Sequence, residues 1–466
     1  MPSRAPLSVL LGLLLAVPFA LLPGSPASAA DPTTITAGAT SGYADTPMTI
    51  AFRLGAADGT PLVAVPVVVE RLVAGTWRPQ GTATTDAGGR VALTASRSRV
   101  RANNTYRATY AGDEVHAAAV ATVTSGLVRR AARVRVVGPS AVKDGARVRL
   151  VIVSSTGDGR PVSGPVRLQR KRAGERRWRT VTTLRTAANG RASHGVRPRG
   201  DTRWRATTPL QDWVRGATSP VHRLDNRPPG KPVRLPAGAP RPKISLPPQP
   251  RATTPGADPV VTTIPDGVWD DMVGRSWHAG CPVGRDGLRL LRVNYWGYDG
   301  YRYRGEVVGA TGAVDNMARA LTALYRERFP IRSMYRVDRF GWSSRLQGAN
   351  DYASMDAGNT SGFNCRSVVN RPGVRSPHAY GGSLDINTWE NPYRSATGLV
   401  PNSWWQPRSH PRVAWRSGSH RVVQLVRAAG FSWTYGTGDS QHFDATGGNG
   451  RLLAPTPRAC RGTVCH

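Results

Sequence analysis

The sequence predicts a multidomain protein, in which two all-β sandwiches are followed by an α+β domain. Three observations support this: an internal repeat in the first half, a proline-rich stretch after it, and mixed helical and strand-like periodicity beyond. A chain of 466 residues is long enough for two to four domains. The expected division is a signal peptide (1–30), a first sandwich (31–128), a second, basic sandwich (129–225), a linker (226–256) and a C-terminal domain (257–466).

The internal repeat has a period of about 100 residues. Between its landmarks lie short runs of alternating apolar and polar residues, separated by turn residues, as expected for antiparallel sandwiches. The two modules resemble bacterial Ig-like domains, and this resemblance implies spacing or binding rather than catalysis. The matched landmarks are Gly59-Thr60-Pro61 with Gly159-Arg160-Pro161, Trp77-Arg78 with Trp178-Arg179, and Tyr106-Arg107-Ala108-Thr109 with Trp204-Arg205-Ala206-Thr207.

The N-terminus and the cysteines indicate an exported protein. Arg4, an apolar run over 7–22 and a small-residue Ala-x-Ala site ending at Ala29 or Ala30 are typical of a secretory signal peptide. No other stretch approaches transmembrane length, so we expect no membrane span in the mature form. Export permits disulfides, and four cysteines allow three pairings. Of these we favour Cys281–Cys365 with Cys460–Cys465.

The net charge of +34 is concentrated in one part of the chain. Residues 129–250 carry 28 basic and 6 acidic residues, whereas 251–466 carry 26 and 16. An anionic partner is therefore expected for the basic module 129–225, and for an exported protein we favour an anionic cell-wall polymer. Arginines beside Trp178 also suit nucleic-acid phosphates, but export disfavours that partner, and a solvated basic face is the third alternative.

The linker and the C-terminal domain differ in amino-acid composition and in the periodicity of their apolar residues. The proline-rich linker 226–256 is expected to be extended, with no catalytic site. Beyond it, apolar residues from Val314 to Tyr325 recur at helical spacing, and Phe329-Pro330 ends that helix. A second helix is predicted over 422–429, ended by Gly430, with a strand over 431–435 directly after it.

Two clusters in this domain predict a metal site. His378 and Asp385 are separated by six residues that include Gly381-Gly382, and Asp439 lies three residues before His442. A hydrolytic zinc site needs about three protein ligands and one open position for water. His378, Asp385 and His442 are the predicted ligands, and Asp439 is positioned to take a proton from water. The other histidines are assigned to surface or hydrogen-bonding roles: His116, His194, His222, His278, His410, His420 and His466.

The ordered motifs over roughly 290–445 resemble the zinc D-Ala-D-Ala carboxypeptidase and L-alanyl-D-glutamate endopeptidase family. The matching residues are Ser376-x-His378-x-x-Gly381-x-Ser383-x-Asp385, Asp439-x-x-His442-Phe443, the segment Asn359-Thr360-Ser361-Gly362-Phe363-Asn364-Cys365-Arg366, Asn391-Pro392-Tyr393 and Phe329-Pro330-Ile331.

This resemblance implies an α+β zinc peptidase domain of the D,D-peptidase/Hedgehog type with one zinc ion. The zinc ligands would be His378, Asp385 and His442. Asp439 would be the general base, and Arg366 would be the cation that polarises the scissile carbonyl. Ser383 stands where the family most often has Ala, which is a minor change. Asp439 stands where several relatives have Glu; its shorter side chain suits the endopeptidase-like branch and leaves the choice of peptide bond open.

The function expected from these features is hydrolysis of peptide bonds in peptidoglycan stem peptides by a secreted, cell-wall-associated metallopeptidase. The bond would be that of a D-alanyl-D-alanine carboxypeptidase or of an L-Ala-D-Glu-type endopeptidase. The alternative is a non-catalytic wall-binding or adhesion protein with Ig-like modules. The intact set of four residues argues against that alternative, because a decayed site would not keep every group.

Overall fold

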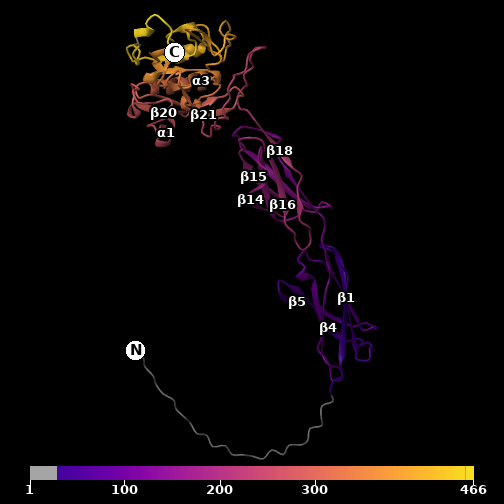
Figure 1. Cartoon of the computed structure of the whole chain (residues 1–466). Coiled ribbons are helices and arrows are strands. Elements are labelled where there is room, and N and C mark those ends of the chain that lie inside the picture. Colours follow the sequence, from indigo (N-terminus) through magenta and orange to yellow (C-terminus); the bar gives the residue numbers. More distant parts are fainter. Residues whose placement is uncertain (1–28, 457) are drawn as a thin grey trace, which may run out of the picture.

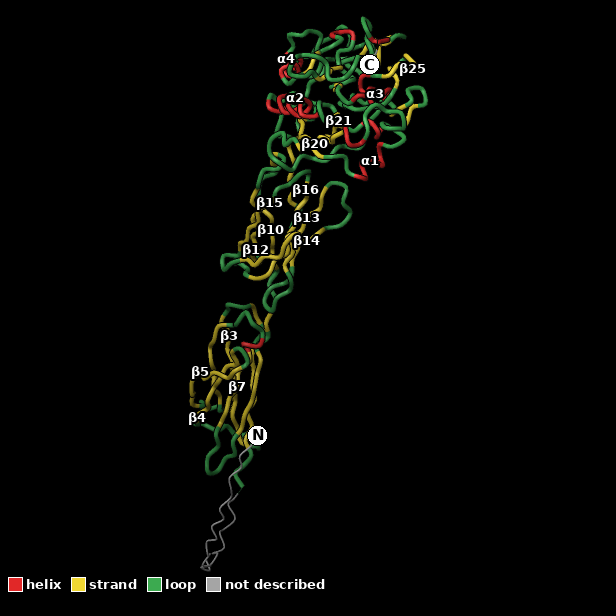
Figure 2. Tube along the Cα trace, turned by 90° about the vertical axis from the view of Figure 1, so that its left-hand side faces the viewer, coloured by secondary structure: helices red, strands yellow, loops and turns green. Residues whose placement is uncertain are grey.

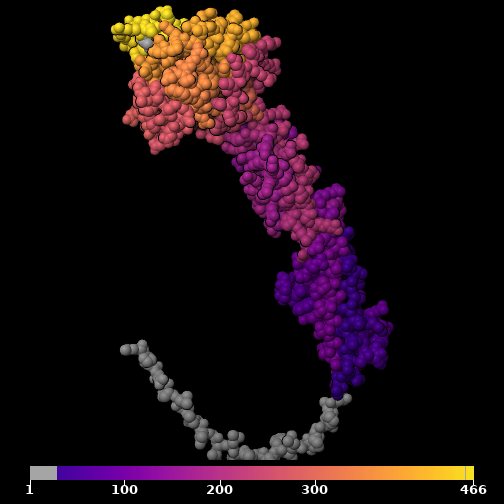
Figure 3. Space-filling view, in the orientation of Figure 1, coloured from indigo at the N-terminus to yellow at the C-terminus, as the bar shows by residue number. Residues whose placement is uncertain are grey.

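A computed structural model describes residues 29–456 and 458–466 of the chain. It is an elongated molecule in which two β-sandwiches follow one another and lead to a C-terminal domain (Figures 1 and 3). The predicted signal peptide falls, except for its last two residues, outside the described part. Among the described residues, no helix is both long and apolar enough to span a bilayer.

The first sandwich packs a three-stranded sheet against a four-stranded one. Its strands alternate as a half-buried sheet requires: Met48, Ile50, Phe52 and Leu54 of β3 point into the core, and their neighbours face solvent. The sheets are β1-β3-β6 and β5-β4-β7-β8, built from β1 (Thr33–Ala39), β3 (Pro47–Ala56), β6 (Arg90–Ser96), β4 (Pro66–Val73), β5 (Thr76–Thr84), β7 (Thr105–Tyr110) and β8 (Ala119–Thr124), with β2 (Gly42–Tyr43) pairing β9 (Leu127–Val128).

The second sandwich repeats this plan (Figure 2). Trp204 is buried in its core at the position that matches the buried Tyr106 of the first, as the internal repeat requires. The strands are β10 (Ala132–Val137), β12 (Val148–Thr156) and β15 (Arg191–Val196) in one sheet, and β11 (Ala141–Lys143), β18 (His222–Arg227), β16 (Thr202–Thr208), β13 (Gly164–Arg172), β14 (Arg179–Thr186) and β17 (Ala217–Thr218) in the other.

The C-terminal domain is α+β. Helices α2 (Val314–Arg326) and α4 (Arg421–Ala428) pack together, and one core joins them to a sheet of β19, β20 and β21 and to a sheet of β26, β30 and β29. The strands of these sheets are β19 (Val260–Thr262), β20 (Leu288–Trp296), β21 (Arg302–Ala310), β26 (Ser383–Asp385), β30 (His442–Ala445) and β29 (Phe431–Ser432). The smaller elements are α1 (Asp266–Met272), α3 (Asp351–Asp356) and the hairpins β22 (Trp342–Ser343) with β23 (Gly348–Ala349), β24 (Ser367–Val368) with β25 (Arg371–Arg375), and β27 (Tyr393–Ser395) with β28 (Gly398–Val400).

The two helices predicted from apolar spacing are confirmed as α2 and α4. The predicted strand over 431–435 is correct only for Phe431 and Ser432. After these two residues the chain leaves the sheet, because its side chains make loop contacts instead. Thr434 Oγ1 donates to Asp444 Oδ2 at 2.7 Å, and Trp433 Nε1 donates to the carbonyl of Ser440 at 3.1 Å.

The proline-rich segment is extended, and it is packed along the C-terminal domain. The amide of Val233 donates to the carbonyl of Tyr298 at 2.7 Å. The side chain of Gln249 is buried, where its amide nitrogen donates to Met334 O at 2.6 Å and its oxygen accepts from Met334 N at 2.9 Å. The backbone amide of Val233 and the side chain of Gln249, which a free linker would offer to water, are therefore paired with protein.

Both predicted disulfides are present. Cys281–Cys365 ties the loop after α1 to the segment that leads to Arg366. Cys460–Cys465 closes a small loop near the end of the sequence. Neither places a free thiol near the predicted site, and no free cysteine occurs in the described residues.

Candidate metal centre

The pairing of two short strands brings Asp385 and His442 together. Strand β26 pairs antiparallel with β30, so that Asp385 lies opposite His442 and Leu384 lies opposite Phe443. Because side chains alternate along a strand, Leu384 and Phe443 enter the core while Asp385 and His442 share the other face. Two residues 57 positions apart thus become direct neighbours.

His378 reaches the same face through a tight turn. Ser376 caps the 3₁₀ helix η4 (Pro377–Tyr380) by accepting from the His378 amide. Gly381 then adopts φ 69°, and a Cβ there would meet the amide nitrogen of Ala310 at 2.6 Å. Only glycine fits this position, and the chain can turn there from His378 into β26.

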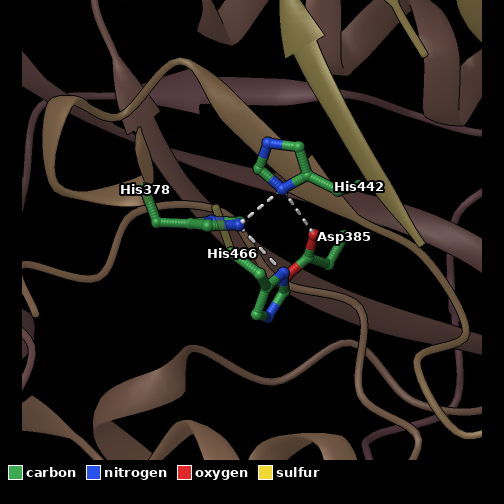
Figure 4. Close-up of side chains that lie close together, drawn as sticks. All are labelled: His378, Asp385, His442 and His466. Atoms are coloured by element: carbon green, nitrogen blue, oxygen red, sulfur yellow. Dashed lines mark hydrogen bonds and ion pairs between the residues drawn. The ribbon is translucent and has the colours of Figure 1, made fainter. Parts of the chain in front are cut away.

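The three predicted ligands lie within hydrogen-bonding distance of one another and are almost fully buried (Figure 4). His378 Nε2 is 3.1 Å from Asp385 Oδ2 and 3.0 Å from His442 Nδ1. His442 Nδ1 is 3.2 Å from Asp385 Oδ1. The structure therefore brings together all three residues expected to hold the ion.

In each histidine, the ring nitrogen that points away from Asp385, here called the outer nitrogen, lies next to a hydrogen-bond acceptor. His378 Nδ1 is 2.7 Å from the carbonyl of Gly362, and His442 Nε2 is 2.9 Å from Asp444 Oδ1. A carbonyl or carboxylate oxygen only accepts, so both outer nitrogens carry the proton. His378 Nε2 and His442 Nδ1 then both face Asp385. A carboxylate and two ring nitrogens that converge in a buried space favour a cation between them, and this donor set fits a metal ion.

The charges of this cluster are strongly coupled. Burial raises the pKa of Asp385, but His378 and His466 outweigh it and hold that pKa well below its usual value. Burial lowers the pKa of His442, but Asp444 and Asp385 reverse this and hold it well above 6.5. Burial also opposes ionisation of Asp444, yet His442, Ser383 and Thr434 bring the pKa of Asp444 down to about 2.

A fourth residue, His466, was missed by sequence reasoning, which assigned it a surface or hydrogen-bonding role. Its ring is fully buried, and one of its nitrogens lies with the ligand atoms of His378, Asp385 and His442 inside a group no wider than 4.8 Å. His466 Nε2 is 3.5 Å from Asp385 Oδ2. No local spacing connects residue 466 with these positions. The nearest signal is the Cys460–Cys465 pair directly before it.

The side chains of Asp439 and Arg366 contact His466, and not the three predicted ligands. Asp439 is fully buried, its Oδ2 accepts from His466 Nδ1 at 3.1 Å, and its Oδ1 has no partner among the described residues. Arg366 is 3% exposed and pairs with Asp351 Oδ2 at 2.8 Å. It also donates to the backbone oxygen of His466 at 2.8 Å.

A second group of metal-binding residue types does not form such a site. His278, Cys281 and Cys365 lie close together, but the two sulfurs are bonded to each other. The ring nitrogens of His278 face the carbonyls of Ala279 and Cys365 at 2.8 and 3.2 Å. Without thiolates this group is a structural contact, in agreement with the role expected for His278.

Residues 370–445 match the model of a family described as D-alanyl-D-alanine carboxypeptidase. This segment contains His378, Asp385, Asp439 and His442. The fold and the site thus define two β-sandwiches followed by a domain of the peptidase type, with a buried His/Asp group suited to a metal ion. No curated protein is significantly similar to the chain.

Solved structures with related β-sandwiches share little sequence with this chain. The bacterial integrin-binding protein invasin is 14% identical over 58% of this chain, with a TM-score of 0.29, and the match covers only 47% of the invasin chain. The D0–D1 domain of intimin is 17% identical over 42% of this chain and 97% of that chain, with a TM-score of 0.16. Bovine butyrophilin is 13% identical over 40% and 97% of the two chains, with a TM-score of 0.23. At such TM-scores these likenesses carry no argument about function.

Proposed function

We propose that this protein is a secreted zinc metallopeptidase that hydrolyses peptide bonds in the stem peptides of peptidoglycan. The observation that carries the proposal is the orientation of His378 Nε2 and His442 Nδ1, which both face Asp385 in a buried space. The match of 370–445 to a D-alanyl-D-alanine carboxypeptidase family supports the reaction class. The predicted signal peptide supports export.

His378, Asp385 and His442 would hold one zinc ion. Two imidazoles and one carboxylate are a ligand set typical of hydrolytic zinc, and Asp444 orients the His442 ring from behind. When bound, zinc supplies Lewis-acid polarisation of the scissile carbonyl and lowers the pKa of water.

Two further residues, Asp439 and Arg366, would act on the proton of the attacking water and on the scissile carbonyl. Asp439 keeps an unpartnered carboxylate oxygen, Oδ1, and would accept the proton of the attacking water. Arg366 is held in place by Asp351 and would stabilise negative charge on the carbonyl oxygen. Its Nε has no partner among the described residues, so it keeps a free donor.

The proposal is tested by measuring zinc content and product masses together. Asp385→Ala and His442→Ala should lose both zinc and hydrolysis of a defined muropeptide. Asp439→Ala should keep zinc and lose roughly 10²-fold or more of the turnover, as expected for a general base. Full zinc occupancy in the first two variants would contradict the ligand assignment. The product masses would also decide between D-Ala release and cleavage after L-Ala.

We further propose that the second sandwich tethers the enzyme to an anionic cell-wall polymer. A cleft of about 530 Å³ in this sandwich is lined by Trp204 and by four arginines: Arg170, Arg172, Arg197 and Arg199. Burial, and after it the nearby Arg172, lowers the pKa of Arg170, so an anion in the cleft would relieve unfavourable charge.

A further inference from the structure

Residues 458–466 cover the candidate metal centre. We call this stretch, which follows Pro457 and contains the loop closed by Cys460–Cys465, the tail segment. Cys465 and His466 are fully buried, whereas Arg458, Arg461 and Thr463 are exposed. The buried end of the tail segment thus enters the domain, and its loop remains at the surface.

The ring of His466 occupies the space beside the three predicted ligands (Figure 4). Its centroid lies 5.3 Å from the ring of His378 and 5.8 Å from the ring of His442. Its Nε2 is 3.0 Å from Asp351 Oδ2 and 3.5 Å from Asp385 Oδ2. The ring therefore lies in direct contact with the predicted ligand set.

His466 also engages both residues proposed to act on the substrate. Its Nδ1 binds the Oδ2 of Asp439, the proposed base. Its backbone oxygen accepts from Arg366, the proposed carbonyl-stabilising cation, and from the amide of Val369 at 3.0 Å. His466 thus contacts the proposed base, the proposed carbonyl-stabilising cation and a predicted metal ligand at the same time.

A permanent fourth side-chain ligand is at odds with a hydrolytic role. Catalytic zinc sites keep one position for water or substrate, whereas sites closed by four side chains are structural. Yet the site has features of a reaction centre, because Asp439 Oδ1 and Arg366 Nε are buried without partners among the described residues. The presence of His466 at the site and the unpartnered atoms of Asp439 and Arg366 are both explained if His466 fills the fourth position reversibly.

The tail segment has few apolar anchors. They are the disulfide against Val368 and Val374 and the partly buried Val464 against the cluster around Leu346 and Tyr393. The ring of His466 is held by polar contacts to Asp351 and Asp439, which a bound metal ion would have to replace in part. The disulfide restricts the free loop and so lowers the entropy lost on docking. Because the segment is part of the chain, its effective concentration at the site is high.

We propose that the tail segment is an intramolecular plug, in which His466 takes the fourth ligand position of the metal and excludes water and substrate until the segment withdraws. This inference rests on the proposed metal centre. It predicts a low basal activity in the intact chain and a higher one when the His466 imidazole is removed.

The test uses the full chain loaded with Co²⁺, and compares wild type with His466→Ala. We expect one cobalt per chain in both proteins and a changed visible spectrum in the variant, because one nitrogen ligand is lost. Azide should bind the cobalt of His466→Ala at least tenfold more tightly than that of wild type. Turnover of a defined muropeptide should rise at least tenfold. His222→Ala, in the second sandwich, is the control and should match wild type.

A second variant covers the case that His466→Ala does not fold, which thermal unfolding would reveal. The double substitution Cys460→Ser and Cys465→Ser keeps His466 but releases the loop, and should give azide affinity between those of wild type and His466→Ala. One cobalt per chain with equal azide affinity in wild type and both variants would overturn the plug and leave the metal centre intact. Loss of cobalt in His466→Ala alone would make His466 a structural ligand and overturn the plug. Absence of cobalt from every protein would overturn the metal centre itself.

Discussion

His442 and Asp444 lie two residues apart on β30, and the imidazole Nε2 of His442 donates to Asp444 Oδ1 at 2.9 Å. This contact directs the lone pair of His442 Nδ1 toward Asp385. Asp444 is itself held by hydroxyl groups, from Ser383 at 2.6 Å and Thr434 at 2.7 Å. The Asp444 carboxylate thus sets the tautomer of His442, a predicted metal ligand, without being a predicted ligand itself.

Asp444→Asn should weaken metal binding by about 10- to 100-fold, the usual loss when such a supporting carboxylate is removed. The amide can donate to His442 Nε2 and so favour the tautomer with a proton on Nδ1. Competition with a chromophoric chelator would measure the affinity. Asp270→Asn, on the exposed face of α1, is the matched control. Equal affinities in both variants would show that Asp444 does not orient the ring.

Metal affinity should rise with pH between about 6 and 8. In the metal-free chain the pKa of His442 lies well above its usual value, so a proton competes with the ion at neutral pH. Each bound ion then displaces a proton from His442. Where His466 also binds, a second proton leaves that ring, because burial, which lowers the pKa of His466, is outweighed by Asp385 and Asp439, which raise that pKa to about 9. The apparent affinity should therefore increase by at least tenfold per pH unit. Titration calorimetry in buffers of different ionisation enthalpy would count the protons released. An affinity independent of pH would contradict the raised pKa.

Gly381→Ala should destabilise the C-terminal domain by roughly 3 kcal/mol or more, because the new Cβ would collide with the amide of Ala310 as well as adopt a positive φ. Gly373→Ala is the matched control. It also has a positive φ, 78°, but has open space around it, so we expect a cost of about 1 kcal/mol. Urea unfolding followed by tryptophan fluorescence would compare them. A similar loss in both variants would rule out the steric role of Gly381.

Gln249→Ala should reduce stability by about 2–4 kcal/mol, because it leaves the buried amide of Met334 and the hydroxyl of Tyr295 without their partner. It also removes one of the two donors to the Met334 carbonyl, which keeps the amide of Glu306. The exposed Gln347 provides the control, and Gln347→Ala should change stability by no more than about 0.5 kcal/mol. Limited proteolysis should also cut the segment 231–248 faster in Gln249→Ala. Unchanged stability and cleavage would mean that the proline-rich segment is a free spacer.

Arg172→Ser with Arg197→Ser should weaken binding to a teichoic-type phosphate polymer, because both arginines line the cleft of the second sandwich. Arg78→Ser with Arg90→Ser removes the same charge from exposed positions of the first sandwich and should have a smaller effect. Co-sedimentation with cell walls would measure binding. It should fall by roughly tenfold or more between low and physiological salt. Binding that ignores salt would contradict a charge-driven tether.

The residues of the candidate metal centre other than His466 were predictable, because each lies in a local motif. The spacing of His378 to Asp385 around two glycines, and of Asp439 to His442, is visible along the chain, and the strand pairing of Asp385 with His442 brings the two motifs together. Helix α2 was predictable for a similar reason, since Val314, Met317 and Leu321 repeat at helical spacing. The strand expected over 433–435 was wrong because loop contacts outweigh strand propensity there.

The sequence by itself determined the fold class, the two disulfides favoured among three pairings, and the three predicted ligand residues that the structure brings together, since these depend on periodicity and short-range spacing. Only the tertiary structure decided that His466 enters the cluster, that Asp439 and Arg366 surround it, and that the proline-rich segment packs along the domain. The physical reason is the same in each case. These contacts join positions far apart in the chain, and the packing that brings them together has no period or spacing that can be recognised in the sequence.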